Sequence, residues 1–313
     1  MGHTDQVKTD LERLEKYLTD HRCTFRGVPM PTLIKPNFIS REQSVLLHNS
    51  VEVMSRALTK VISAYLEDGR IREIMGFSDK EDELFRIDPG YSNPLVISRL
   101  DAFLDGNSLK YLEFNCDSPA GIAYADVMED GFRELFREYP FLESYRIDYA
   151  RRQDMLLSSL LTCYHEFRAS RKSMPEKPVI AIVDWDDVST YSEFELHQAH
   201  FLSRGLDTII AAPQDFTVRN GKAFVRGQEV HLVYRRVITR ELMARWDQVG
   251  TFINSVRDGL VCCCNSFRSF IVGNKKILSV ITDPRFSSIF SRQELEMIKR
   301  TVPWTRVLAD RTV

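Results

Sequence analysis

The sequence has no long hydrophobic run and no excess of positive charge, and each of these absences excludes a class of protein. No stretch of about 18 apolar residues occurs, so no segment is expected to cross a membrane. Lysine and arginine number 42 against 44 aspartate and glutamate, and this net charge of −2 argues against nonspecific binding to nucleic acid. The polar segment 1–10 lacks the apolar core of a signal peptide, so we expect a cytoplasmic protein.

The six cysteines match neither a disulfide framework nor a zinc site. Three are consecutive at 262–264, the others are scattered, and paired Cys-x-x-Cys motifs are lacking. Because segment 259–265 is apolar, it predicts a buried strand with reduced thiols. The sequence also lacks a Gly-rich phosphate loop and a Ser/His/Asp order suited to nucleophilic catalysis.

Composition and apolar periodicity predict a mixed α/β protein. Apolar residues make up 43% of the 313 positions, enough for a packed core in about two domains of ~150 residues. Helical spacing marks 11–18, 40–69, 122–137 and 147–170; Ser40 with Gln43 resembles a capping box, and Gly69 is expected to end that helix. Strands at 95–104 and 109–115 are joined at Asp105-Gly106-Asn107, a strong turn signal.

The second half alternates short apolar strands with helices, which predicts a small layer with a parallel sheet. A polar segment with two prolines at 168–178 marks a domain boundary. We therefore expect helices plus the hairpin in 1–170, an α/β domain in 178–265, and the start of a further subdomain in 266–313.

The hairpin carries an unusual density of polar groups. Side chains alternate between the two faces of a strand, so Arg99, Asp101, Glu113 and Asn115 share one face if 99 lies opposite 113 and 101 opposite 111. Tyr111 then joins the polar face, and the core face consists of Leu100, Ala102, Leu112 and Phe114. A slip of one residue would split the polar set.

Carboxylate and carboxamide oxygens are the hard ligands that Mg²⁺ takes, usually together with phosphate oxygens. An arginine beside them would bind a phosphate at two points or offset the charge of phosphoryl transfer. The polar face therefore suggests a metal–phosphate site. The alternative is a solvated sheet face with an arginine–glutamate cross-strand pair.

These residues resemble a known signature. Arg99-Leu-Asp101 followed by Tyr111-Leu-Glu-Phe-Asn-Cys-Asp-Ser-Pro-Ala-Gly121 looks like that of circularly permuted ATP-grasp proteins, the group that includes glutathionylspermidine synthase. Similar segments follow in the family's order: Leu232-Val-Tyr-Arg-Arg236, Asn265-Ser-Phe-Arg268, Asn274-Lys275 and Pro303-Trp-Thr-Arg306. The resemblance spans residues 90–313, and more loosely the N-terminal helices, and is most specific in the hairpin.

The resemblance implies an ATP-dependent carbon–nitrogen ligase that activates a small-molecule or peptide carboxylate as an acyl phosphate, which an amine then attacks. It implies that Asp101, Glu113 and Asn115 bind Mg²⁺, with Mn²⁺ as an alternative, and that Arg99 lies near the transferred phosphate. The implied fold is a circularly permuted ATP-grasp, in which the hairpin subdomain precedes a Rossmann-like pre-ATP-grasp domain.

Four further residues take roles from the resemblance. Lys275 falls where the family carries its first nucleotide-contacting lysine, and the adjacent Lys276 is the alternative. Asp117 and Ser118 lie where the family places the acceptor substrate. For Ser118, a cap on the following helix is an equal alternative.

Arg235 and Arg236 are candidate catalytic residues on a different ground. They follow a buried strand, and the ends of such strands carry ligand groups in α/β layers. Two arginines at this place would bind a substrate carboxylate. The alternative is a pair of structural salt bridges.

The sequence also departs from the family. A second lysine in a Leu-Lys-Pro-like strand and a Gly-rich loop are lacking, so we expect residues 1–313 to be an N-terminal portion that does not catalyse ligation alone. We also expect weak nucleotide binding, and self-association through apolar residues left uncovered around Phe270, Ile277, Leu278 and Ile281. Two other functions remain open: a non-catalytic nucleotide- or peptide-binding module, and a phosphotransferase that uses the same hairpin.

Overall fold

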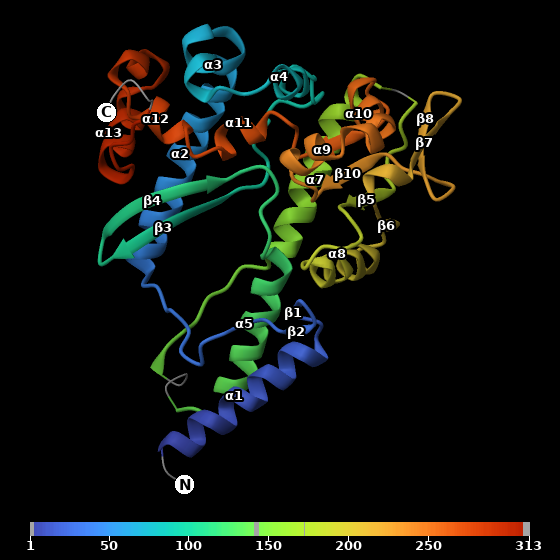
Figure 1. Ribbon diagram of the computed structural model, residues 1–313. Helices are drawn as coiled ribbons and strands as arrows, with labels where there is room; N and C mark the ends of the chain where they lie inside the picture. The colour runs from blue at the N-terminus through green and yellow to red at the C-terminus, as the bar shows by residue number, and fades with distance from the viewer. Residues whose placement is uncertain (1–2, 141–143, 172, 309–313) are drawn as a thin grey trace.

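The computed structural model describes residues 3–140, 144–171 and 173–308, and its fold is mixed α/β (Figure 1). The helices are α1 (His3–Asp20), α2 (Arg41–Glu67), α3 (Gly69–Met75), α4 (Asp79–Phe85), α5 (Ile122–Phe136), α7 (Arg152–Ala169), α8 (Tyr191–Ser203), α9 (Thr239–Ala244), α10 (Gly250–Arg257), α11 (Ser269–Gly273), α12 (Ile277–Ile281) and α13 (Arg292–Thr301). The strands are β1 (Thr24–Phe25), β2 (Val28–Pro29), β3 (Arg99–Asp105), β4 (Ser108–Asn115), β5 (Ile180–Val183), β6 (Thr208–Ala211), β7 (Phe216–Arg219), β8 (Lys222–Val225), β9 (Gln228–Glu229), β10 (Leu232–Arg235) and β11 (Cys262–Cys264).

A four-stranded parallel sheet in the order β11-β10-β5-β6 forms the centre of the second half. On one face of this sheet, even-numbered strand residues such as Ile182 and Tyr234 pack with apolar residues of α7 and α8. Odd-numbered positions such as Val183 and Val233 join a larger core that also holds residues of α2, β4 and the C-terminal helices. Both faces are therefore buried, which explains the continuous apolar strands. All six cysteines are free and buried, which confirms the burial and the reduced thiols predicted for the three at 262–264.

The hairpin β3–β4 is fastened to the long helix α2. The start of α2 is the predicted capping box, in which Ser40 and Gln43 each accept a hydrogen bond from the other's backbone N–H. The Gln43 side chain also donates to the carbonyl of Gly106 at the hairpin turn (2.9 Å), and Ser50 is hydrogen-bonded to the Tyr111 hydroxyl (2.8 Å). The end of α2 differs from the prediction, because Asp68 ends it and also caps α3, which begins at Gly69.

The C-terminal helices are covered, contrary to our expectation. Phe270, Ile277, Leu278 and Ile281 are all buried, because α11 packs on α2 and β4 and α12 packs on α3. The exposed apolar face that suggested self-association is therefore not present at these residues.

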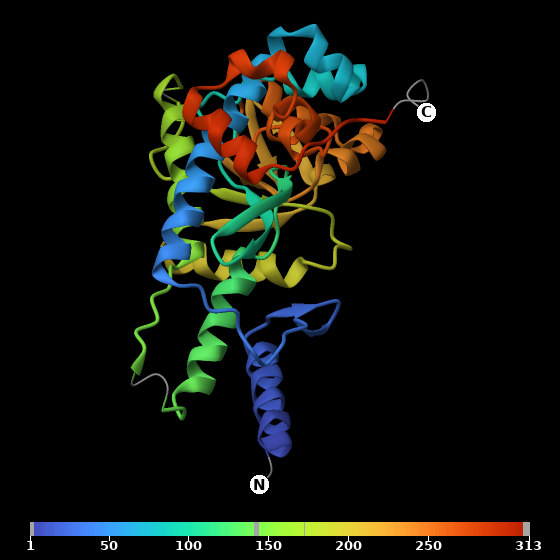
Figure 2. The ribbon, with the colours of Figure 1, turned by 90° about the vertical axis from the view of Figure 1, so that its left-hand side faces the viewer.

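Helices α1 and α5 pack against each other at the end of the molecule opposite α13 (Figures 1 and 2). They approach closely at Gly131, where an added Cβ would lie 2.9 Å from a ring carbon of Tyr17. Within the described residues, no helix combines the length and the apolarity needed to span a membrane.

Candidate functional site

The polar face of the hairpin depends on a β-bulge. Near the turn, odd-numbered residues of β3 pair with even-numbered residues of β4, as Asp105 does with Ser108. The register shifts between Asp101 and Ala102. Beyond this shift, odd-numbered residues of the two strands pair with each other, so Asp101 lies opposite Glu113 and Arg99 opposite Asn115. The expected pairs 99–113 and 101–111 are wrong by two residues, yet all four polar side chains lie together.

The bulge also corrects the expected core face. The extra residue is Leu112, which has no cross-strand partner and is 41% exposed instead of buried. Tyr111, expected on the polar face, is buried with its hydroxyl on Ser50. Phe114 is buried as predicted. One added residue therefore turns Tyr111 into the core while keeping Glu113 on the polar face.

Hydrogen bonds hold the four polar residues in one cluster. Arg99 donates from Nε to Oδ1 of Asp101 (2.9 Å) and from Nη1 to the carbonyl of Ala120 (3.1 Å). The Asn115 amide nitrogen donates to Asp101 Oδ2 (3.1 Å) and to Glu113 Oε1 (3.2 Å). Two carboxylates from neighbouring strands thus converge on a single donor, as they would on a cation.

Lys275 reaches the same cluster from a distant part of the chain. Its ammonium lies 2.8 Å from Oε2 of Glu113. The pKa of the Glu113 carboxyl is held below its ordinary value, first by the hydrogen bond from Lys275 and then by that from Asn115. Lys276 points elsewhere and donates to the carbonyl of Met75 at the end of α3 (2.9 Å).

The position of Lys275 follows from the docking of α11 onto the end of β4. Gly273 ends α11, and a Cβ at this glycine would lie 3.4 Å from the backbone nitrogen of Asp117. The backbone of α11 therefore lies within van der Waals contact of the backbone after β4. The close approach brings the start of the next helix, and with it Lys275, beside the hairpin.

Arg235 and Asp117 lie in the interior, where each binds the other. Arg235 is 1% exposed and donates to Asp117 Oδ1 (2.7 Å) and to the carbonyls of Asn265 and Val237 (3.0 and 2.8 Å). The Asp117 carboxylate also accepts from the backbone and hydroxyl of Thr239 (2.6 and 2.8 Å). The structure therefore places this pair in a buried link between the hairpin and the parallel sheet.

Arg236 and Ser118 form a second link of the same kind. Arg236 is buried, bonds to the carbonyl of Pro119, and lies 3.3 Å from a carboxylate oxygen of Glu193. The Ser118 hydroxyl donates to the carbonyl of Arg236 (2.6 Å) and does not cap α5. The contacts of Arg236 match the structural salt bridge considered as its alternative, whereas the helix cap considered for Ser118 is not formed.

Two residues to which the sequence had assigned no role hold the site in place. The Glu193 carboxylate accepts from the backbone N–H groups of Gly121 and Ala123 (2.7 and 3.2 Å), so it caps α5 in place of Ser118. The Asn265 side chain accepts from the backbone of Ile97 (2.8 Å) and donates to the carbonyl of Cys116 (2.8 Å). The sequence contained one indication for Asn265, because this residue begins the segment 265–268 that is similar to a segment of the ATP-grasp family.

The donor set fits Mg²⁺ only as a partial site. Among the described residues, no group of three or more acidic, histidine or cysteine side chains is arranged to hold a metal by itself. Asp101, Glu113 and Asn115 offer two carboxylates and one amide, which suits a cation that shares its remaining ligands with phosphate and water. For the amide oxygen to face the cation, the Asn115 side chain must rotate.

Comparison with known proteins gives a structural likeness without a match in sequence. No protein-family model matches the sequence, and a search of curated proteins found no significant match. The fold is similar to the solved structure of a glutathione synthetase-like effector from Globodera pallida in its apo form, with a TM-score of 0.64 and 11% sequence identity. The match covers 96% of this chain and 71% of that chain, and at this identity it shows a glutathione synthetase-like fold.

Proposed function

We propose that this chain carries the metal- and phosphate-binding hairpin of an ATP-dependent carboxylate–amine ligase. The reaction joins a small-molecule or peptide carboxylate to an amine through an acyl phosphate. The glutathione synthetase-like fold supports an ATP-grasp type of site, and the hairpin offers carboxylate, amide and guanidinium groups that suit its metal and phosphate part. Mg²⁺, or Mn²⁺ in its place, is the metal in this proposal.

The observation that carries the proposal is the convergence of opposite charges at the hairpin. Asp101 and Glu113 approach one point from neighbouring strands, and the cations of Arg99 and Lys275 each contact one of these carboxylates (2.9 and 2.8 Å). A polyphosphate needs both kinds of group, because its oxygens bind cationic side chains directly and carboxylates through a metal ion. Residues 99 and 275 are far apart in the chain and meet only in the fold.

Each residue then has a distinct task. Asp101, Glu113 and Asn115 would hold the metal, which when bound offsets the charge of the phosphates. The planar guanidinium of Arg99 is held by Asp101 and by the carbonyl of Ala120. It is therefore oriented to bind a phosphoryl group through two N–H groups. Lys275, whose side chain is 67% exposed, is free to leave Glu113 and follow the phosphates.

A non-catalytic binding module is the second candidate, and one observation favours it. The Arg99 and Lys275 side chains are 52% and 67% exposed, so water reaches the cluster freely in the described structure. An acyl phosphate formed there would be hydrolysed unless a further part of the protein covered it. Nucleotide or peptide binding without turnover requires no such cover.

The experiment that separates these functions follows ADP release from Mg-ATP by the purified chain. Release that requires both an added amine and an added carboxylate supports the ligase. Release with a single acceptor and no amine supports a phosphotransferase, and nucleotide binding without release supports the module. Failure of Mg-ATP to bind at all would reject the hairpin as a metal–phosphate site. Glu113→Gln tests the site, with Glu296→Gln on the exposed face of α13 as the matched control.

A further inference from the structure

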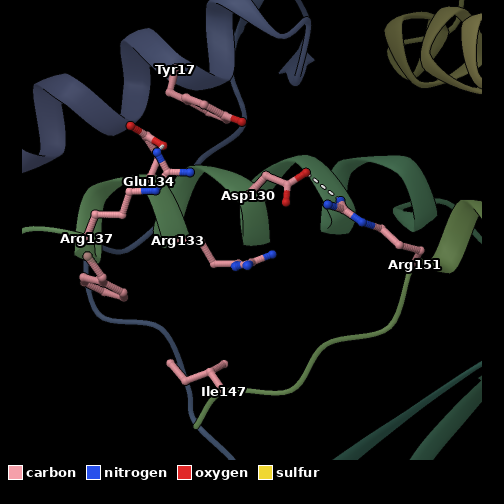
Figure 3. Close-up of a pocket in the computed structure, with 8 residues that line it drawn as sticks. Tyr17, Asp130, Arg133, Glu134, Arg137, Ile147 and Arg151 are labelled. Carbon is pink, nitrogen blue, oxygen red and sulfur yellow. Dashed lines mark hydrogen bonds and ion pairs between the residues drawn. The ribbon is translucent and has the colours of Figure 1, made fainter. Parts of the chain in front are cut away.

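A second charged cavity lies away from the hairpin, between α1, the C-terminal half of α5 and the segment 147–151 (Figure 3). Its volume is about 550 Å³, within the usual size range of small-molecule sites. Its walls combine charged and apolar side chains, contributed by Tyr17, Asp130, Arg133, Glu134, Phe136, Arg137, Ile147 and Arg151.

Charge in this cavity is unbalanced in favour of cations. Arg151 is paired with Asp130 (2.6 Å) and Arg137 with Glu134 (2.8 Å). Arg133 has no carboxylate within ion-pair distance among the residues that the structure describes. Among the lining residues that the structure describes, three arginines therefore face two carboxylates, and the guanidinium without a carboxylate partner there is that of Arg133.

The Arg133 side chain is positioned to receive a ligand. It extends from α5 into the space enclosed by the helix and the segment that carries Ile147 and Arg151 (Figure 3). Its guanidinium carbon lies 4.0 Å from the centre of the Tyr149 ring, and that of Arg151 lies 5.0 Å from the same ring. Stacking on Tyr149 restrains the guanidinium plane while leaving its N–H groups available for an oxyanion.

We propose that this cavity binds a small organic anion, whose carboxylate or phosphate contacts Arg133 while its apolar part lies against Phe136 and Ile147. A guanidinium binds either oxyanion at two points, so the shared chemistry is a planar or tetrahedral oxyanion on an apolar body. Aromatic and aliphatic walls favour such a ligand over a free inorganic ion.

This site is separate from the hairpin and does not depend on the proposed ligase activity. Arg133 follows the first residue of α5, Ile122, by eleven positions, which at about 1.5 Å per residue places it roughly 16 Å along the helix. The loop that joins the hairpin to α5 is at the opposite end of that helix.

The test is calorimetric titration of the full chain with phenyl phosphate, phenylacetate and inorganic phosphate, in EDTA so that no divalent metal contributes. We expect saturable binding of phenyl phosphate or phenylacetate, at least tenfold tighter than inorganic phosphate. Which of the two binds more tightly identifies the oxyanion. Arg133→Gln should weaken binding at least tenfold, and Arg133→Lys should weaken it less. Arg146→Gln is the matched control, because Arg146 directly precedes the segment 147–151, is exposed and is outside the cavity lining.

A second measurement avoids any effect of substitution on folding. Phenylglyoxal modifies accessible arginines, and mass spectrometry reports which ones. Bound phenyl phosphate or phenylacetate should protect Arg133 and leave Arg146 as reactive as before. The proposal is overturned if none of the probes binds saturably, if Arg133→Gln and Arg146→Gln weaken binding equally, or if Arg133 is not protected.

Discussion

Replacement of Asp117 by alanine should destabilise the protein strongly, because Asp117 neutralises a buried arginine. In the variant, the Arg235 guanidinium keeps its bonds to backbone carbonyls but has no counter-charge at 1% exposure. The backbone and hydroxyl of Thr239 also lose their acceptors. Removal of one partner of a buried ion pair typically costs ~3–5 kcal/mol, and we expect a loss of this size in the free energy of unfolding.

Asp117→Asn refines this prediction. The amide keeps the shape and one acceptor oxygen but removes the negative charge, so the expected loss is smaller, about 1.5–3 kcal/mol. Glu296→Ala is the surface control, since the Arg292–Glu296 pair is exposed and its removal should change stability by less than ~0.5 kcal/mol.

The assay is urea-induced unfolding followed by far-ultraviolet circular dichroism and by tryptophan fluorescence, with the same denaturant dependence required of all variants. Asp117→Ala should unfold at clearly lower urea than the parent, and Asp117→Asn in between. A loss below ~1 kcal/mol for Asp117→Ala would refute the structural role. It would return Asp117 to the substrate-binding role suggested by the family resemblance.

Two further predictions concern stability. Burial raises the pKa of the Asp184 carboxyl to about 6. Its contribution to the free energy of unfolding is therefore fully present below the pKa of the unfolded state, where the carboxyl is protonated in both states. This contribution is lost as the pH rises through 6 and the buried carboxyl ionises. Asp184→Asn should therefore stabilise the protein at pH 7 by up to ~3 kcal/mol, a gain that vanishes near pH 4; thermal melts across this range check it, and a gain independent of pH would contradict it. Phe114→Ala should cost ~3–5 kcal/mol and Leu112→Ser less than ~1 kcal/mol in urea unfolding, and similar losses for both would mean that the bulge is misplaced.

Local signals in the sequence were enough to predict most elements of the fold. The capping box at Ser40, the turn at Gly106 and the buried strand within 259–265 all lie as the residue patterns indicate. Each depends on contacts between neighbours in the chain, where residue type and spacing decide the outcome.

The rest depended on packing between distant segments. The bulge at Leu112 places the Tyr111 ring in the core and its hydroxyl on Ser50, and no spacing rule along the strand includes that contact. Burial of Arg235 could not be predicted from its place at the end of β10. The carboxylate that neutralises it belongs to Asp117, which follows β4 of the hairpin and is distant in the sequence. The contact of Lys275 with Glu113 likewise exists only because α11 docks on β4.

The most direct test of the proposed site measures Mn²⁺ binding by electron paramagnetic resonance, with and without ATP. We expect ATP to strengthen Mn²⁺ binding to the parent chain, since phosphate oxygens complete the ligands offered by Asp101, Glu113 and Asn115. Glu113→Gln should weaken Mn²⁺ binding in the presence of ATP at least tenfold, with an unchanged circular dichroism spectrum, whereas Glu296→Gln should leave it unaltered. Equal Mn²⁺ affinity of the parent and Glu113→Gln in the presence of ATP would contradict the claim that this hairpin holds the metal.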